Sequence, residues 1–433
     1  MVYEDMGNGL SRRGFVKGAA AGVLSTAVAA TLGPAVYAAG SDRIRLGLIG
    51  CGGRGLHDTT NCLKAAEGVE LVAMADLFAD RLKDCRTSLT KALPDKVKVT
   101  EDHCFVGWNA YKDLLATDVD LVILTQAPHF RPSHLKAAVE AGKHVFMEKP
   151  VAVDPVGVRS VIESSEKAGK KGLTILAGTQ MRRISHMVEA AKRVEAGELG
   201  TILAGQCVRL GDAMRSWGPQ QRQAGWSDME WQIRRWLFMT WLSGDFIVEM
   251  HVHNLDMMNW LIGSHPVQCT GMGGRQQRIE PEFGDSYDHF AVEYEYPNGL
   301  RIEYMGAQID KMGNGRNDQR LVGTKGSLYA DFAQARFEGQ TKAEIAWDQV
   351  DPCLKAHADQ ISAIRNHTPL NEGRRIAESS LTAIMGRMST YTGRTLKWDW
   401  AMTASKLDLT PPAYKFGDLP MPRPAIPGKT PLV

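Results

Sequence analysis

The sequence has few cysteines and no Cys-x-x-Cys pair. Its cysteines are scattered over 433 residues and odd in number, which argues against a zinc ribbon and against a disulfide framework. They stand at positions 51, 62, 85, 104, 207, 269 and 353. Cys51 sits inside a glycine turn, and we interpret it as filling a small space there rather than acting as a nucleophile.

A large charge of either sign is also lacking. Lysine and arginine number 51 and the acidic residues 49, so the formal net charge is +2 at pH 7. We therefore predict neither nucleic acid nor an anionic membrane as a partner. Hydrophobic residues make up 44% of the chain, which allows a full core, and the length suggests two or three domains. The sequence contains no internal repeat.

The N-terminal segment resembles a twin-arginine (Tat) export signal. Arg12 and Arg13 precede a run of Ala, Gly, Val and Leu from residue 18 to about 39. A membrane anchor is the alternative, but Pro34 and the small residues leave the run only weakly hydrophobic. We expect the Tat machinery to export the protein and residues 1–38 to be removed. The expected location is the periplasm, or elsewhere outside the cytoplasm, without a stable membrane anchor.

Residues 44–55 predict a dinucleotide site. A short apolar run leads into Gly50-x-Gly52-x-x-Gly55, and Asp76 ends the next apolar run. Gly50 permits a tight turn, Gly52 lets the backbone approach a pyrophosphate, and Gly55 allows close helix–strand packing. Asp76 falls where the ribose 2′-hydroxyl would lie and would repel the extra phosphate of NADP, so we predict NAD. A structural glycine turn is the alternative. The other turn residues predicted to contact NAD are Cys51, Gly53 and Arg54.

Strand and helix patterns alternate from residue 44 to about 178. Strands are predicted at 121–126, 144–149 and 173–177, and helices at 132–142 and 154–172. Such alternation is typical of an α/β Rossmann domain with a doubly wound parallel sheet. We assign residues 42–178 to this NAD-binding domain.

After residue 200 the pattern changes to alternating strands, predicted at 267–271, 290–296, 300–305 and 327–332, with a hairpin turn at 297–299. Helices predicted at 352–366 and 372–392 cover this sheet or return to the first domain. We therefore predict an α+β substrate and oligomerisation domain with a mostly antiparallel open sheet, residues 179–400. The tail, residues 401–433, holds seven prolines and is predicted to be an extended arm on the surface or on a partner subunit.

The motif Glu148-Lys149-Pro150 resembles the signature of the Gfo/Idh/MocA family, named for glucose–fructose oxidoreductase, inositol dehydrogenase and rhizopine catabolism. Further similar segments are 126–129, 178–182 and 244–256. The resemblance implies an NAD-dependent oxidoreductase. It implies cofactor contacts for Gln126, Pro128, His129, Glu148, Lys149 and Gln180, and a substrate contact for Arg182.

Segment 244–256 is similar to the family pattern D-x-G-x-H-x-x-D. Glu249 stands at the first acid, His251 replaces the glycine, and His253 and Asp256 keep their places. Hydride removal from a carbinol carbon needs a general base at the hydroxyl, and the neutral imidazole of His253 suits that role. Glu249 or Asp256 is predicted to orient the ring, and all three side chains to contact the substrate. A satisfied core histidine is the alternative for His253.

Lys149 is predicted to donate a hydrogen bond to the same hydroxyl oxygen, because it follows a parallel strand beside the expected nicotinamide. A surface lysine that caps the strand before Pro150 is the alternative. Metal binding by the histidines and acids of segment 244–256 is a rival use of those residues. We predict no metal, because a helical continuation would direct Asp256 away from His251 and His253.

Tryptophan and arginine are concentrated between residues 215 and 241. The members are Trp217, Trp226, Trp231, Trp236 and Trp241 with Arg215, Arg222, Arg234 and Arg235. Indole rings stack on pyranose faces, and guanidinium groups bind hydroxyls and carboxylates. We predict that this stretch walls the substrate pocket, with Trp236 in contact with substrate; a subunit interface is the alternative.

These observations predict an exported NAD-dependent oxidoreductase that acts on a hydroxyl of a sugar, glycoside or cyclitol, and a homodimer or homotetramer. A redox-neutral glycoside hydrolase, similar to the NAD-dependent glycosidases related to this family, is one alternative. A non-catalytic protein that retains nucleotide is another. Because an exported protein has no soluble NAD pool, NAD should be loaded before export and stay bound.

Overall fold

The structure is a computed structural model that describes residues 42–212, 221–311 and 315–433. The predicted export signal with Arg12 and Arg13 lies outside the described residues, as do Arg215 and Trp217. None of the helices in the described ranges combines the length and apolar character that crossing a lipid bilayer requires.

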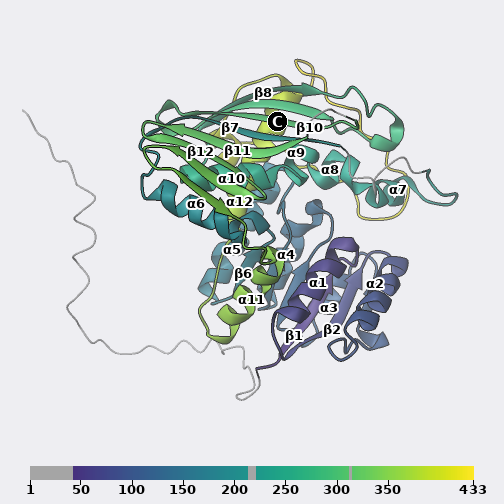
Figure 1. The fold of residues 1–433 in the computed structure, drawn as a ribbon. Coiled ribbons are helices and arrows are strands. Elements are labelled where there is room, and N and C mark those ends of the chain that lie inside the picture. The colour runs from purple at the N-terminus through teal and green to yellow at the C-terminus, as the bar shows by residue number, and fades with distance from the viewer. Residues whose placement is uncertain (1–41, 213–220, 312–314) are drawn as a thin grey trace, which may run out of the picture. The chain divides into compact units, whose positions relative to one another are not determined.

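Six parallel strands form the sheet of the first domain, in the order β3-β2-β1-β4-β5-β6. They are β1 (Ile44–Ile49), β2 (Val69–Asp76), β3 (Cys104–Val106), β4 (Leu121–Leu124), β5 (His144–Met147) and β6 (Ile175–Ala177). β1, β2 and β6 are labelled in Figure 1. β4 and β5 are buried at every position, as strands covered on both faces require. The strand order reverses between β1 and β4, where doubly wound sheets bind their ligands. The predicted Rossmann sheet is confirmed.

Five helices belong to the first domain, and one of them, α5, begins at a side-chain cap. They are α1 (Gly53–Ala65), α2 (Ala79–Ala92), α3 (Ala110–Leu115), α4 (Arg131–Glu140) and α5 (Pro155–Lys170), with the 3₁₀ turns η1 (Glu101–His103) and η2 (Pro128–Phe130). The Asp154 side chain accepts the N–H of Gly157, and Pro155 occupies the first position of α5. The capped helix predicted from residue 154 is therefore confirmed.

Nine strands form the sheet of the second domain, in the order β14-β13-β12-β11-β7-β10-β9-β8-β15. They are β7 (Ile202–Gly211), β8 (Gln268–Gly274), β9 (His289–Glu295), β10 (Arg301–Gln308), β11 (Arg316–Gly323), β12 (Gly326–Asp331), β13 (Gln334–Gly339), β14 (Ala343–Ala346) and β15 (Leu396–Lys397). Neighbours are antiparallel except β7 and β10, which confirms the mostly antiparallel sheet. The central strand β7 was not predicted, because its residues lack a regular apolar–polar alternation.

Helices α6 (Ser185–Glu195), α10 (Val252–Ile262) and α12 (Gly373–Thr392) lie between this sheet and the first domain (Figure 1). α12 packs against both α5 and β8, so it covers the sheet and also joins the domains. α11 (Pro352–Arg365) returns to the first domain and packs against α1 and η3 (Gln180–Arg183). The remaining short elements are α7 (Asp228–Arg234), η5 (Trp236–Phe238), α8 (Thr240–Ser243), α9 (Phe246–Glu249), η6 (Pro281–Phe283), η7 (Pro297–Gly299) and α13 (Trp398–Thr403).

The C-terminal arm, residues 404–433, lies along the surface of its own chain without helix or strand. The Leu409 N–H donates to the Asp154 carboxylate at 2.9 Å in the first domain. Further along, the Leu419 carbonyl accepts from the Gln232 amide at 2.7 Å in the second domain. The arm therefore crosses from one domain to the other.

Candidate active site

A cavity of about 910 Å³ opens at the carboxyl ends of the parallel strands and extends to the second domain. Most predicted site residues line it: Gly50, Cys51, Gly52, Gly53, Arg54, Asp76, Gln126, Glu148, Lys149, Gln180, Trp236, Glu249 and His253. Five others are not part of the lining: Gly55, Pro128, His129, Arg182 and Asp256.

The glycine turn between β1 and α1 leaves room that side chains would fill. Gly50 has φ +100°, and a Cβ there would lie 2.5 Å from the Gln126 nitrogen. A Cβ on Gly55 would collide with the carbonyl oxygen of Gly50. The Cβ position of Gly53 faces open space with no atom within 4 Å, at the N-terminal end of α1. A pyrophosphate suits this place, because the first N–H groups of a helix lack partners within it.

Asp76 ends β2 beside this turn. Its carboxylate accepts the N–H of Cys51 at 2.6 Å and that of Phe78 at 2.8 Å, and burial raises its pKa despite both bonds. The thiol of Cys51 lies 3.6 Å from the Ala75 carbonyl, and burial raises the pKa of Cys51 well above its usual range. Cys51 is therefore a protonated packing group, while Asp76 keeps lone pairs for ribose hydroxyls.

Gln126 supplies a further sign of a polar ligand. Its amide nitrogen and oxygen are both buried and have no hydrogen-bond partner among the described residues. An unsatisfied buried polar group costs about 1–3 kcal/mol. The residues present fit NAD: the glycine turn would hold the pyrophosphate, Asp76 the ribose diol, and Gln126 another polar group of the cofactor.

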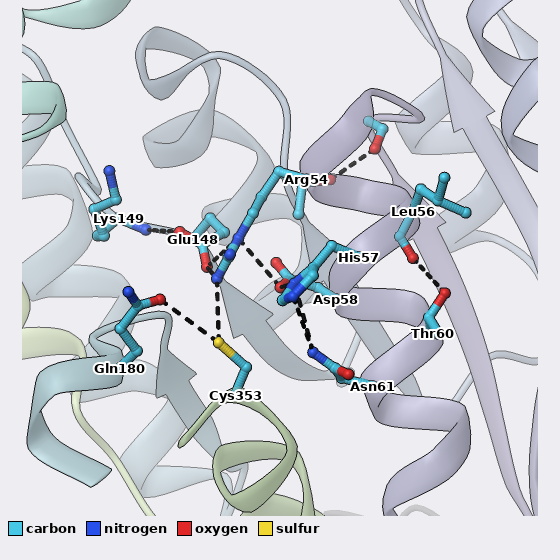
Figure 2. Close-up of polar contacts among 12 residues, drawn as sticks. Arg54, Leu56, His57, Asp58, Thr60, Asn61, Glu148, Lys149, Gln180 and Cys353 are labelled. Atoms are coloured by element: carbon cyan, nitrogen blue, oxygen red, sulfur yellow. Dashed lines mark hydrogen bonds and ion pairs between the residues drawn. The ribbon is translucent and has the colours of Figure 1, made fainter. Parts of the chain in front are cut away.

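Arg54 reaches from α1 to Glu148, which follows β5 (Figure 2). Its Nη2 donates to Glu148 Oε1 at 2.6 Å, and its Nε lies 3.2 Å from the Asp58 carboxylate. Burial alone would raise the pKa of Glu148, but Arg54 and Lys149 outweigh it and hold that pKa below its ordinary value. Gly178 leaves room for this carboxylate, because a Cβ at that position would collide with it.

Lys149 is held by Glu249, at the end of α9. Its Nζ donates to Glu249 Oε1 at 3.0 Å and also to the Glu249 backbone carbonyl. Burial lowers the pKa of Lys149, and the carboxylates of Glu249 and Glu148 offset part of that effect. The ion pair thus fixes the ammonium group in the cavity wall.

His253 lies in the first turn of α10 and faces the same cavity. Burial lowers its pKa well below 6.5, and the positive charges of Lys149 and Arg209 lower it further. The imidazole is therefore neutral at neutral pH. Its Nδ1 is buried and has no partner within the described part of the chain, so the predicted orienting bond from Glu249 or Asp256 is not formed.

His251 is not in the cavity lining. Its Nδ1 lies 2.6 Å from the Tyr304 hydroxyl, and Gly306 leaves room for this pair. Within residues 42–212, 221–311 and 315–433, no three His, Cys, Asp or Glu side chains are grouped to hold a metal ion.

Asp256 and Arg182 need a correction, because they bind each other instead of facing the cavity. Arg182 Nε donates to the Asp256 carboxylate at 2.7 Å, and Arg375 Nη1 donates at 2.9 Å. Ser379 adds a third bond at 2.6 Å. Burial would raise the pKa of Asp256, but the two guanidinium groups outweigh it and keep that pKa well below its usual range. This network ties η3 to α10 and α12.

Two residues of the predicted cofactor segment 126–129 lie beside the cavity. Pro128 begins η2, and His129 packs edge-on against Trp241 with ring centroids 5.1 Å apart. The Nε2 of His129 lies 2.8 Å from the Tyr414 hydroxyl, and burial lowers the pKa of His129 to about 4. The structure gives His129 a packing role with the C-terminal arm.

Among the described tryptophans between residues 226 and 241, Trp236 lines the cavity. Trp231 and Trp241 are buried in the second domain. Trp226 lies against Trp231, and the Arg234 guanidinium stacks over the Trp226 ring at 4.8 Å. Arg234 also joins this stretch to the first domain, because it lies over the Phe78 ring at 3.9 Å and pairs with Asp80 at 3.0 Å.

Three arginines of the cavity lining were missed from the sequence: Arg81 of α2, Arg131 and Arg209. Arg131 begins α4 and donates to the Pro150 carbonyl. It follows the end of the predicted strand at Gln126 by five residues, and this position could have indicated a cavity residue. Arg209 lies on β7 and donates to the Met250 carbonyl at 2.8 Å. No local pattern marks Arg209, because its neighbours in space come from distant segments.

The two domains match two family models. Residues 44–175 match GFO_IDH_MocA, the oxidoreductase family with an NAD-binding Rossmann fold, and residues 187–329 match the GFO/IDH/MocA C-terminal domain. Together the two matches cover more than half of the chain.

Two curated relatives illustrate the range of similar proteins. The chain is 28% identical to 2,7-anhydro-N-acetylneuraminate hydratase of Escherichia coli over 230 residues, 52% of this chain and 56% of the relative. It is 25% identical to inositol 2-dehydrogenase 3 of Saccharopolyspora erythraea over 261 residues, 60% of this chain and 65% of the relative. The matched part spans less than two thirds of either relative.

A solved structure of levoglucosan dehydrogenase, in complex with NADH and levoglucosan, is also similar. Its TM-score is 0.65 at 16% identity, over 82% of this chain and 99% of that chain. At this level of identity the similarity shows the fold.

Proposed function

The chain belongs to the Gfo/Idh/MocA family of NAD-binding oxidoreductases, and from this we propose that it transfers a hydride between a sugar, glycoside or cyclitol hydroxyl and tightly bound NAD. The inositol and levoglucosan dehydrogenases among the similar proteins support this substrate class. One observation carries the proposal: the glycine turn, Lys149 and His253 line a single cavity.

The chemistry follows from the charges of these residues. Bound NAD supplies the hydride acceptor. Lys149 Nζ donates a hydrogen bond to the reacting oxygen and stabilises its developing negative charge. An imidazole nitrogen of His253 takes the hydroxyl proton, and the lowered pKa of His253 keeps the ring unprotonated near neutral pH. Glu249 acts as a positioning residue, because it holds the Lys149 ammonium.

The test uses the purified protein with its bound NAD. Sugars, glycosides and cyclitols are added one at a time while the absorbance of the reduced nicotinamide is recorded. Reduction of the bound cofactor by at least one member of this panel supports the proposal. NAD that stays oxidised against the whole panel contradicts it.

A redox-neutral elimination is the second candidate, and the similarity to a hydratase favours it. In that reaction oxidation acidifies the carbon next to the ketone, a proton and the leaving group are lost, and the hydride returns. An aryl glycoside distinguishes the two reactions: the elimination releases phenol with no net reduction of NAD, whereas the dehydrogenase reduces NAD without releasing phenol.

The contacts of the C-terminal arm are evidence that the protein retains NAD. Phe416 stacks on Phe78 with ring centroids 5.9 Å apart and contacts Trp108 at 5.3 Å. Both Phe78 and Trp108 line the cavity. The arm thereby braces the cavity wall from outside, and its attachments to both domains oppose opening of the cleft.

Export and assembly complete the proposal. Changing Arg12 and Arg13 to lysine should leave an unprocessed protein in the cytoplasm; a normally cleaved, exported product would contradict the Tat signal.

We also propose a homodimer or homotetramer, because the strands of the second sheet carry exposed apolar side chains such as Leu203, Met272 and Val322. Light scattering of the purified protein gives the mass, and a monomer would contradict this assembly.

A further inference from the structure

Arg209 is a cavity residue that the proposed hydride transfer does not use. It lies near the end of β7, in the centre of the second sheet. Its Nη1 donates to the Met250 carbonyl at 2.8 Å and lies 3.5 Å from the Asn254 amide oxygen. Among the described residues, Nε and Nη2 have no hydrogen-bond acceptor, although the side chain lines the cavity. One edge of the guanidinium fork is therefore held and the other is available.

The charge around Arg209 is unbalanced. Four cations at the reacting end, Arg54, Arg131, Lys149 and Arg209, interact electrostatically with three carboxylates, those of Asp58, Glu148 and Glu249. Only the Glu249 carboxylate acts on Arg209. That carboxylate already accepts from Lys149 Nζ at 3.0 Å. Asp256 does not compensate, because Arg182 and Arg375 bind it outside the cavity.

This imbalance has a physical cost. Burial lowers the pKa of Arg209, and Glu249 opposes that shift without binding the guanidinium directly. Taking a guanidinium group out of water without an anionic partner is unfavourable. A ligand with one negative charge would balance the surplus cation.

If the proposed hydride transfer is correct, on which this inference rests, we propose that the substrate is a sugar acid whose carboxylate binds the Nε–Nη2 edge of Arg209. A planar carboxylate matches two parallel N–H groups of one guanidinium. A single carboxylate charge also equals the surplus of one cation, whereas a phosphate dianion exceeds it. Arg209 is thus a specificity-determining residue, placed beside Lys149 and His253.

The test compares three substrates of the holoenzyme: glucuronate, glucose and glucose 6-phosphate. Wild type should reduce its bound NAD with the highest kcat/KM on glucuronate, where kcat and KM are the limiting rate and the half-saturating sugar concentration of single-turnover reduction. In Arg209→Met the ratio of kcat/KM for glucuronate to that for glucose should fall about 10- to 100-fold, mainly through KM, because a charged hydrogen-bond partner is lost. Arg209→Lys should recover only part of the ratio, because lysine keeps the charge and lacks the fork.

A structural role for Arg209 would give a different result. Arg209 also supports the Met250 carbonyl, so a merely structural loss would lower kcat/KM for glucuronate and glucose by the same factor. The matched control is Arg320→Met on β11, whose exposed guanidinium binds Asp318 outside the cavity and should leave the ratio unchanged. An unchanged ratio in both Arg209 variants overturns the inference, as does a preference of the wild type for glucose or for glucose 6-phosphate.

Binding measurements separate this inference from the proposed function. Calorimetry with glucuronate on the NAD-loaded wild type and Arg209→Lys needs no turnover. Binding that depends on Arg209, without reduction of NAD by any sugar, would support the anion site and contradict the hydride transfer. Reduction by neutral sugars, without Arg209-dependent binding of glucuronate, would contradict the anion site alone.

Discussion

The cofactor half of the cavity is shaped mainly by backbone, whereas the reacting half is formed by charged side chains. In the cofactor half, Gly50 and Gly55 leave space that a Cβ would fill, and the Asp76 carboxylate accepts two backbone N–H groups. In the reacting half, Lys149 is held by Glu249, which lies 100 positions away in the sequence. The first half should therefore be sensitive to added atoms, and the second to lost charges.

The largest expected effect on NAD binding comes from adding one methyl group to the cofactor half. Gly55→Ala should abolish binding of NAD and destabilise the fold by about 1–3 kcal/mol, because the added Cβ would lie 2.0 Å from the Gly50 carbonyl oxygen. NAD content after purification and thermal unfolding measure both effects. Gly53→Ala in the same turn is the control for stability, because its Cβ position is open. Normal NAD content in Gly55→Ala would contradict the claim that the cofactor half is sensitive to added atoms.

A lost charge outside the cavity should act on stability rather than on chemistry. Asp256→Asn leaves Arg182 without its anionic partner and Arg375 with Glu372 alone, and should lower the free energy of unfolding by about 3–5 kcal/mol. The pKa of Asp256 is lower in the folded than in the unfolded chain, so its contribution is present above its unfolded pKa of about 3.9 and lost as the pH falls through the folded pKa. Denaturant unfolding measures it. Normal stability together with lost turnover would contradict this structural role and support the predicted contact of Asp256 with substrate.

Asp76→Ala tests the main side chain of the cofactor half. NAD affinity should fall about 10- to 100-fold, because hydrogen bonds between the ribose diol and a carboxylate are lost. The preference for NAD over NADP should narrow, because the repulsion of a 2′-phosphate is gone. Titration of the apoprotein with both cofactors measures this. Glu70→Ala, on the same strand and outside the cavity lining, is the control. Equal affinity of wild type for NAD and NADP would contradict the role of Asp76.

The smallest expected effect is at the arm that braces the cofactor half. Phe416→Ala removes ring contacts with Phe78 and Trp108 and should raise the dissociation rate of NAD about 2- to 10-fold. The release of NAD into a scavenging enzyme measures this rate. Met421→Ala, in the same arm, is the control and should release NAD at the wild-type rate. An unchanged rate in Phe416→Ala would limit the arm to a structural role.

The same contrast explains how far the sequence could be interpreted. The glycine turn at Gly50, the strand that ends at Asp76 and the helix at 372–392 each show a local sequence pattern. Glycine spacing and apolar periodicity reflect backbone geometry within a few residues. The Rossmann sheet and its mostly antiparallel partner could therefore be predicted. β7 could not, because its place is set by pairing with β10 and β11, about 100 residues later.

Side-chain partners were harder to predict for the same reason. The similarity of segment 244–256 to the family pattern indicated Asp256 as a substrate residue, but Arg182 and Arg375 bind it from 74 and 119 positions away. Glu249 was expected beside His253 and instead pairs with Lys149. Ion pairs across domains leave no spacing signal in the sequence, so charge partners follow only from the fold.

The most direct test of the account is the pH dependence of the reduction of bound NAD in wild type and His253→Ala. The account predicts a single-turnover rate reduced about 10²- to 10⁴-fold in the variant, with normal NAD content. Because the pKa of His253 is held well below 6.5, the wild-type rate should decline only at pH values well below 6.5, and this acid limb should be absent from the variant. A His253→Ala protein with near-normal turnover and the same acid limb would contradict the account.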